Sequence, residues 1–196
     1  MRSILLATIL TLAGASAAMA QNSAAKDSYS GDAAVAFHFV RVNAGPGQCG
    51  CFNLYGAGVS GSWNFRGPWS VVTEISGDNS SGDPATSSSL TLTSYMAGIR
   101  YQLPQPWLEG PHKPQPFAQL LIGGAHAGGG SAGVGDGAYE FTSRLGGGVD
   151  IPVNSHFSVR LVQIDYYVTR FANQVNDHQN NLLVGAGLVF HWSRPK

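Results

Sequence analysis

The last strand-like segment of the chain restricts the possible folds most strongly. Residues 181–192 alternate between two kinds of side chain. One face would carry apolar and aromatic side chains, namely Val184, Ala186, Leu188, Phe190 and Trp192. The opposite face would carry mostly small ones, namely Leu183, Gly185, Gly187, Val189 and His191. This pattern predicts a strand that forms a wall between lipid and a narrow interior.

The N-terminus has the three parts of a secretory signal. Arg2 is followed by an apolar run over 4–12 and by the small-residue cleavage site Ala18-Met19-Ala20. The alternative is a transmembrane anchor, for which the run is too short. We therefore predict a signal peptide over 1–20.

The rest of the chain has no apolar stretch long enough for a spanning helix, so it could cross a membrane only as a closed barrel. Charged residues make up 11%, below the globular norm of about 25%. Without Arg2, ten basic side chains face eleven acidic ones, which gives no electrostatic reason to expect nucleic acid. The remaining length fits one domain.

Eight segments with strand-like patterns follow a flexible polar segment over 21–33. The predicted strands are 34–43, 54–65, 69–77, 90–103, 116–126, 138–151, 157–171 and 181–192. Polar connections rich in Gly, Ser, Asn and Asp alternate with mostly shorter turns, as in membrane barrels. We predict an all-β fold, an eight-stranded antiparallel up-and-down transmembrane β-barrel over 34–192, with a tail over 193–196.

The strand at 157–171 changes phase along its length. Val159 and Leu161 alternate with Arg160, which places the outward residues at odd positions. Further along, Ile164 and Tyr166 alternate with Asp165, which places them at even positions. One extra residue near Leu161 and Val162 would restore the alternation, so we predict a β-bulge there. The strand at 116–126 has apolar residues on both faces, and its phase stays open.

Under this phase, six charged side chains point into the barrel. They are Glu74, Arg100, Arg144, Asp150, Arg160 and Asp165. An Arg facing lipid at mid-depth costs ~2–4 kcal/mol, which favours the inward assignment. Eight strands leave room only for side chains, so these groups should form a hydrogen-bonded network. The network could be a proton or ion path, but a structural plug is the preferred interpretation.

Aromatic residues near the strand ends indicate interfacial girdles, although a soluble β-sandwich core could use the same residues. They are Trp63, Phe65, Trp69, Tyr101, Trp107, Phe157, Phe171 and Trp192.

Other chemical motifs are weak. Cys49 and Cys51 could be oxidised to a loop disulfide in an exported protein. His126 and His178 would lie at the same end of the barrel, but no ligand spacing supports a metal site. The glycines of 128–133 match a nucleotide-binding pattern without the helix that it needs. We therefore predict no catalytic residues, no metal and no cofactor.

The chain resembles small bacterial outer-membrane barrels, the group of the OmpA membrane domain and the OmpX-type proteins. The resemblance rests on the signal peptide, on 95–101, on 146–171 and on the last strand. It implies a bacterial outer-membrane location among lipid and lipopolysaccharide, and insertion by the outer-membrane assembly machinery. Phe190 and Trp192 resemble the terminal recognition signal, although 193–196 follow it.

Three functions remain open. The first is a non-enzymatic, monomeric surface barrel with a structural role or a binding role through its polar loops. The second is a lipid A-modifying enzyme, for which His126 and Ser131 are the nearest candidates without a matching motif. The third is a small-solute channel, which would need a more open interior than the inward charges indicate.

Overall fold

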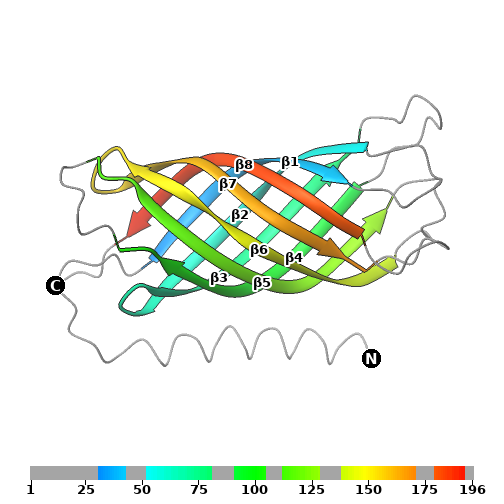
Figure 1. The fold of residues 1–196 in the computed structure, drawn as a ribbon, viewed down its shortest axis with the longest axis horizontal. Helices are drawn as coiled ribbons and strands as arrows, with labels where there is room; N and C mark the ends of the chain where they lie inside the picture. The colour runs from blue at the N-terminus through cyan, green and yellow to red at the C-terminus, as the bar shows by residue number, and fades with distance from the viewer. Residues whose placement is uncertain are drawn as a thin grey trace.

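The chain forms a closed barrel of eight strands. The computed structural model describes residues 31–42, 52–80, 91–104, 112–128, 138–170 and 179–192. The strands are β1 (Gly31–Val42), β2 (Phe52–Arg66), β3 (Trp69–Asn79), β4 (Thr91–Gln102), β5 (Gln115–Gly128), β6 (Ala138–Pro152), β7 (Phe157–Thr169) and β8 (Gln179–Trp192). Each strand pairs with the next in the sequence (Figure 1). The predicted fold class is confirmed.

All neighbouring strands are antiparallel, including the pair that closes the barrel. β1 pairs with β8 from Gly31 opposite Trp192 to Arg41 opposite Leu182. Closure leaves no sheet edge, so every strand finds backbone partners on both sides. None of the described residues forms a helix that could cross a membrane.

The first strand begins earlier than predicted. β1 starts at Gly31, so residues 31–33 belong to the barrel rather than to the polar segment assigned to 21–33. Gly31 pairs with Trp63 on β2 and with Trp192 on β8, and these cross-strand partners extend the strand past its local Gly-Asp signal. The predicted signal peptide, residues 21–30 and the tail 193–196 lie outside the described residues.

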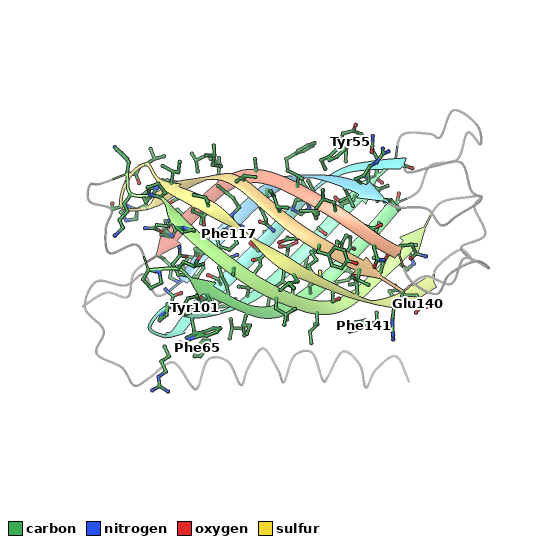
Figure 2. The ribbon with its side chains drawn as sticks, in the orientation of Figure 1. Tyr55, Phe65, Tyr101, Phe117, Glu140 and Phe141 are labelled. Atoms are coloured by element: carbon green, nitrogen blue, oxygen red, sulfur yellow. The ribbon has the colours of Figure 1, made fainter. Side chains whose placement is uncertain are left out.

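The strand faces alternate as predicted. Large apolar side chains such as Val59, Ile122 and Leu188 are exposed on the outside of the barrel, whereas the inward positions are buried. Figure 2 shows Tyr55 and Phe141 on the outer face and Phe117 within the barrel. The position of Phe117 settles the ambiguous phase of β5.

The outer face carries aromatic contacts toward both ends of the barrel. At the end with the short turns, ring pairs include Trp69 with Tyr101 and Phe157 with Phe190, with centroid separations of 4.7 and 5.2 Å. At the other end, Phe39 lies 5.4 Å from Tyr55. Trp107 and Phe171, also predicted for the girdles, lie outside the described residues.

The predicted β-bulge is present in β7. Val149 pairs with Val162 and Asp150 pairs with Arg160, so Leu161 has no partner on β6. The register with β8 shifts at the same place, between Arg160 and Gln163. The extra residue changes the phase, and both Arg160 and Gln163 are buried in the interior.

The turn between β2 and β3 depends on a glycine. Gly67 has φ of +53°, a left-handed conformation that side chains with a Cβ disfavour. This turn, the β6–β7 turn and the end of β8 lie at the same end of the barrel, which we call the turn end (Figure 1). The opposite end is the loop end.

Candidate functional site

The barrel interior contains all six charged residues that the sequence placed there. Glu74, Arg100, Arg144, Asp150, Arg160 and Asp165 are all buried. Each arginine has a carboxylate partner: Asp32 for Arg100, Glu74 for Arg144 and Asp150 for Arg160. Each of the three arginines is therefore paired directly, whereas Asp165 accepts hydrogen bonds from the amides of Gln119 and Gln163.

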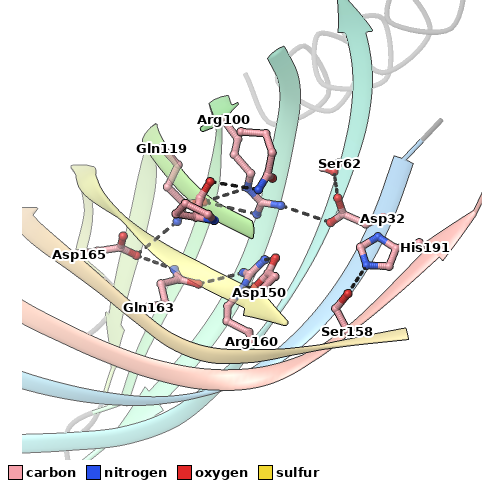
Figure 3. A network of polar contacts seen from close by, with 12 residues as sticks. Asp32, Ser62, Arg100, Gln119, Asp150, Ser158, Arg160, Gln163, Asp165 and His191 are labelled. Carbon is pink, nitrogen blue, oxygen red and sulfur yellow. Dashed lines mark hydrogen bonds and ion pairs between the residues drawn. The ribbon is translucent and has the colours of Figure 1, made fainter. Parts of the chain in front are cut away.

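Toward the turn end, Arg160 anchors one branch of a polar network (Figure 3). Its guanidinium donates to both carboxylate oxygens of Asp150, at 2.8 and 3.1 Å. It also donates to Gln163 Oε1 at 2.9 Å, and the Gln163 amide donates to Asp165 at 2.6 Å. Two parallel hydrogen bonds between a guanidinium and a carboxylate give this branch a defined geometry.

A second branch reaches Asp165 from β5, two strands away from β7. Arg100 donates to Gln119 Oε1 at 3.4 Å, and the Gln119 amide donates to Asp165 at 3.4 Å. Arg100 also donates to Asp32 at 3.3 Å, and Asp32 accepts from Ser62 at 2.5 Å. Asp165 therefore joins both branches, each of which ends at an arginine paired with a carboxylate.

An aromatic ring fills the space between the two arginines. The guanidinium carbons of Arg100 and Arg160 lie 4.7 and 4.5 Å from the ring centroid of Phe117. A Cβ on Gly148 would come within 2.9 Å of the Phe117 ring, so the glycine makes room for the ring. Cations over an aromatic ring are attracted by its quadrupole, which stabilises this stack. Phe117 therefore packs against an arginine of each branch of the network.

Deeper in the barrel, Arg144 organises a second polar group. It forms an ion pair with Glu74 and donates to the hydroxyls of Ser76 and Ser94 at 2.9 and 3.2 Å. Its guanidinium carbon also lies 4.6 Å from the ring centroid of Tyr167. These contacts satisfy most of the guanidinium in a buried environment, as a buried charge requires.

Apolar side chains occupy the remaining parts of the interior. Val72, Met96 and Leu121 form one buried cluster. A larger cluster lies toward the loop end and consists of Val40, Val42, Leu54, Leu92, Ala125, Ala127, Tyr167 and Leu183. Together with the polar groups, these clusters give the interior the character of a packed core.

A serine–histidine pair lies buried at the turn end. The Ser158 hydroxyl and His191 Nε2 are 2.7 Å apart (Figure 3). Asp32 pairs with His191 across the strands, yet its two oxygens accept from Ser62 and Arg100. Ser158 is only 1% exposed, so a substrate could not reach its hydroxyl.

The terminal-strand aromatics lie on the outer part of the barrel wall. Phe190 packs against Phe157, and Trp192 lies 6.4 Å from Trp63 between ring centroids. Cys49 and Cys51 lie outside the described residues, as do His178 and Ser131. Within the described part of the chain, no three His, Cys, Asp or Glu side chains are grouped to hold a metal ion.

Several interior residues are not evident from the sequence. Asp32 falls in the polar segment expected before the barrel, and Gln119 lies in a strand whose phase is ambiguous. Gln163 is placed on the inner face by the predicted bulge but carries no charge, so it does not stand out beside the charged groups. The uncharged amides are nevertheless what connects the ion pairs to one another.

The chain matches the family model described as the outer membrane protein beta-barrel domain over residues 7–190. The protein belongs to this family. Membership supports a location in the outer membrane of a Gram-negative bacterium. A comparison with curated protein sequences gives no match.

Solved barrels share the fold at low sequence identity. Neisserial surface protein A (NspA) is 12% identical with a TM-score of 0.63, and the alignment covers 85% of this chain and 100% of that one. Ail, the attachment invasion locus protein of Yersinia pestis, is 15% identical with a TM-score of 0.50, covering 82% of this chain and 99% of that one. At these identities, the likeness establishes the fold alone.

Proposed function

We propose that the protein is a non-enzymatic outer-membrane barrel with a side-chain-filled lumen, which acts at the cell surface or in the integrity of the envelope. The Phe117 ring held between Arg100 and Arg160 carries this proposal. A channel would need a continuous aqueous path, and this stack lies across the interior that an eight-stranded barrel leaves.

The loop end is the proposed binding face. Segments 43–51, 81–90, 129–137 and 171–178 connect successive strands there, and they are rich in Gly, Ser, Asn and Asp. Long polar connections belong to the extracellular side in outer-membrane barrels. We therefore propose that this end faces the outside of the cell, with lipopolysaccharide around it.

We also propose that the barrel is a monomer and that the outer-membrane assembly machinery inserts it. Every strand pairs with two neighbours of the same chain, so no second copy is needed to satisfy a sheet edge. Phe190 and Trp192 at the end of β8 are the residues that we assign to the assembly signal. Alanine at both positions should reduce the folded protein in the outer membrane, whereas alanine at Tyr55 should not.

Planar-bilayer conductance tests the filled lumen. Wild-type protein should first show a heat-modifiable band in the outer-membrane fraction, which reports a folded barrel. The same protein should then give no steady conductance, and Phe117→Ala should raise it relative to the matched outer-face variant Phe157→Ala. Steady conductance of the wild type would contradict the proposal and favour a channel.

Two further experiments separate the remaining functions. Replacement of the four loop segments by short Gly-Ser linkers should leave the heat-modifiable band intact and remove surface binding. Binding that survives the replacement would contradict a loop-mediated role. Overexpression should leave the mass spectrum of lipid A unchanged; a new lipid A species would establish an enzyme instead.

A further inference from the structure

His38 and Asp78 face each other across a glycine in the barrel wall. Gly56 on β2 pairs with His38 on β1 and with Asp78 on β3, so the three residues form one cross-strand row. His38 Nδ1 lies 3.6 Å from Asp78 Oδ1, and both side chains are buried. The separation exceeds the 2.7–3.2 Å of an N–H···O hydrogen bond.

Two glycines make the space around this pair. A Cβ on Gly56 would lie 2.5 Å from Asp78 Oδ1, and a Cβ on Gly58 would lie 2.6 Å from His38 Cε1. Any larger residue at either position would therefore push into the imidazole or the carboxylate. Gly56 and Gly58 therefore contribute no side chain at the place where the two polar side chains meet.

Three side-chain polar atoms of this pair are buried and have no hydrogen-bond partner among the described residues. They are His38 Nδ1, Asp78 Oδ1 and Asp78 Oδ2. A buried carboxylate with neither oxygen hydrogen-bonded is strongly unfavourable, and such a group calls for a bound species that satisfies it.

The charges of the described interior point to a cation. Four buried carboxylates, from Glu74, Asp78, Asp150 and Asp165, and the mostly buried Asp32 lie among only three buried guanidinium groups, those of Arg100, Arg144 and Arg160. Since each guanidinium pairs with one carboxylate, Asp78 and Asp165 remain, with a formal charge of −2 if histidine is neutral. Asp165 accepts from two glutamine amides, whereas Asp78 accepts no hydrogen bond.

We propose that His38 Nδ1 and the Asp78 carboxylate bind one divalent metal ion of the zinc class. Imidazole nitrogen and carboxylate oxygen are ligands of such ions, and two ligands at ~2.1 Å in a tetrahedron lie about 3.4 Å apart. The observed separation of 3.6 Å is close to this value. Water completes the coordination, and one divalent ion offsets the formal charge of Asp78 and Asp165.

The site departs from the expectation of no metal for a topological reason. His38 and Asp78 are brought together by the pairing of three strands, and no short sequence spacing records it. Asp78 also lies beyond the predicted end of its strand at residue 77. The sequence therefore contains the ligands without a recognisable ligand pattern.

Refolding with cobalt(II) tests the site. The full chain with Cys49→Ser and Cys51→Ser, which removes thiols as ligands, is unfolded with chelator and refolded in detergent with and without CoCl2. After gel filtration, elemental analysis should find one cobalt ion per folded barrel, with a visible absorption band from the bound ion. Asp78→Asn and His38→Gln should each lose the ion and the band.

Matched variants keep the test decisive. Asp165→Asn removes the other surplus carboxylate, and His191→Gln removes the other buried histidine; both should retain the cobalt ion. A heat-modifiable band shows that each variant has folded. Folded wild-type barrel without cobalt would overturn the proposal even if the site variants fail to fold. Cobalt that persists in a folded His38→Gln, Asp78→Asn double variant would also overturn it.

Discussion

Arg160 and Gln163 both point into the barrel and share a 2.9 Å hydrogen bond, although an odd number of positions separates them along β7. In a regular strand, residues three apart lie on opposite faces. The bulge at Leu161 accounts for the difference, because it adds one residue that β6 does not pair. The bulge therefore connects the Arg160–Asp150 ion pair to Gln163 and Asp165.

Deletion of Leu161 should remove this connection. Without the extra residue, either Arg160 or the pair of Gln163 and Asp165 would face lipid and lose the hydrogen bonds of the interior, and a charged side chain on the lipid face costs up to ~2–4 kcal/mol. We expect the free energy of unfolding, measured by urea titration in lipid vesicles, to fall by about 2 kcal/mol or more. Deletion of Ser131, in a connecting segment, should change it little. Equal stability of both deletion variants would contradict a role of the bulge in setting the phase.

Removal of one partner of the Arg144–Glu74 pair should strongly lower the free energy of unfolding. Arg144→Met leaves the Glu74 carboxylate buried without its cation, a change that costs about 3–5 kcal/mol in buried pairs. The double variant Arg144→Met, Glu74→Met removes both charges and should recover a large part of that loss. Urea titration of the two single variants and the double variant gives the coupling free energy. A double variant that is the sum of the singles would show that the two groups do not interact.

Gly67 has space for a Cβ but a backbone conformation that disfavours alanine. Its φ of +53° is disfavoured by a Cβ, so Gly67→Ala should lower the free energy of unfolding by about 1 kcal/mol. Gly77→Ala is the control, because a Cβ there meets no atom within 4 Å and no positive φ is involved. A larger loss at Gly77 than at Gly67 in the same urea titration would refute this explanation.

Two equally exposed valines distinguish a lipid-facing wall from a water-facing one. Val59 is 57% exposed in the middle of β2, and Val153 is 53% exposed in the turn after β6. Val59→Arg should reduce stability in vesicles by ~2–4 kcal/mol, whereas Val153→Arg should have little effect, because only Val59 lies at mid-depth. If both arginines were tolerated alike, the middle of the barrel would not be surrounded by lipid.

The face pattern could be predicted from sequence because it is local. A period of two residues separates Leu188 and Phe190 from Val189 and His191 without knowledge of any partner strand. The same rule located the bulge, because one inserted residue shifts the alternation in the way that is visible near Leu161. The strand count followed from the alternation and from the polar connections between the segments.

The interior partners could not be predicted because they are set by the register between distant strands. Arg100 on β4 meets Asp32 on β1, and Arg144 on β6 meets Glu74 on β3. The sequence indicates that these groups share the lumen, but the heights at which they meet depend on the stagger of the closed barrel. The predicted start of β1 and the predicted end of β3 were wrong for a similar reason. Asp32 and Asp78 extend their strands because residues on neighbouring strands pair with them.

The pairing of β1 with β8 also limits when the barrel can form. These strands are the most distant in the described sequence, and Gly31 opposite Trp192 is the widest separation that any ladder spans. Closing so long a loop costs conformational entropy before any contact repays it. Until β8 is available, β1 and β7 each expose an unpaired edge, which is a template for pairing with another chain. The nascent chain is therefore vulnerable to aggregation until its last strand is complete.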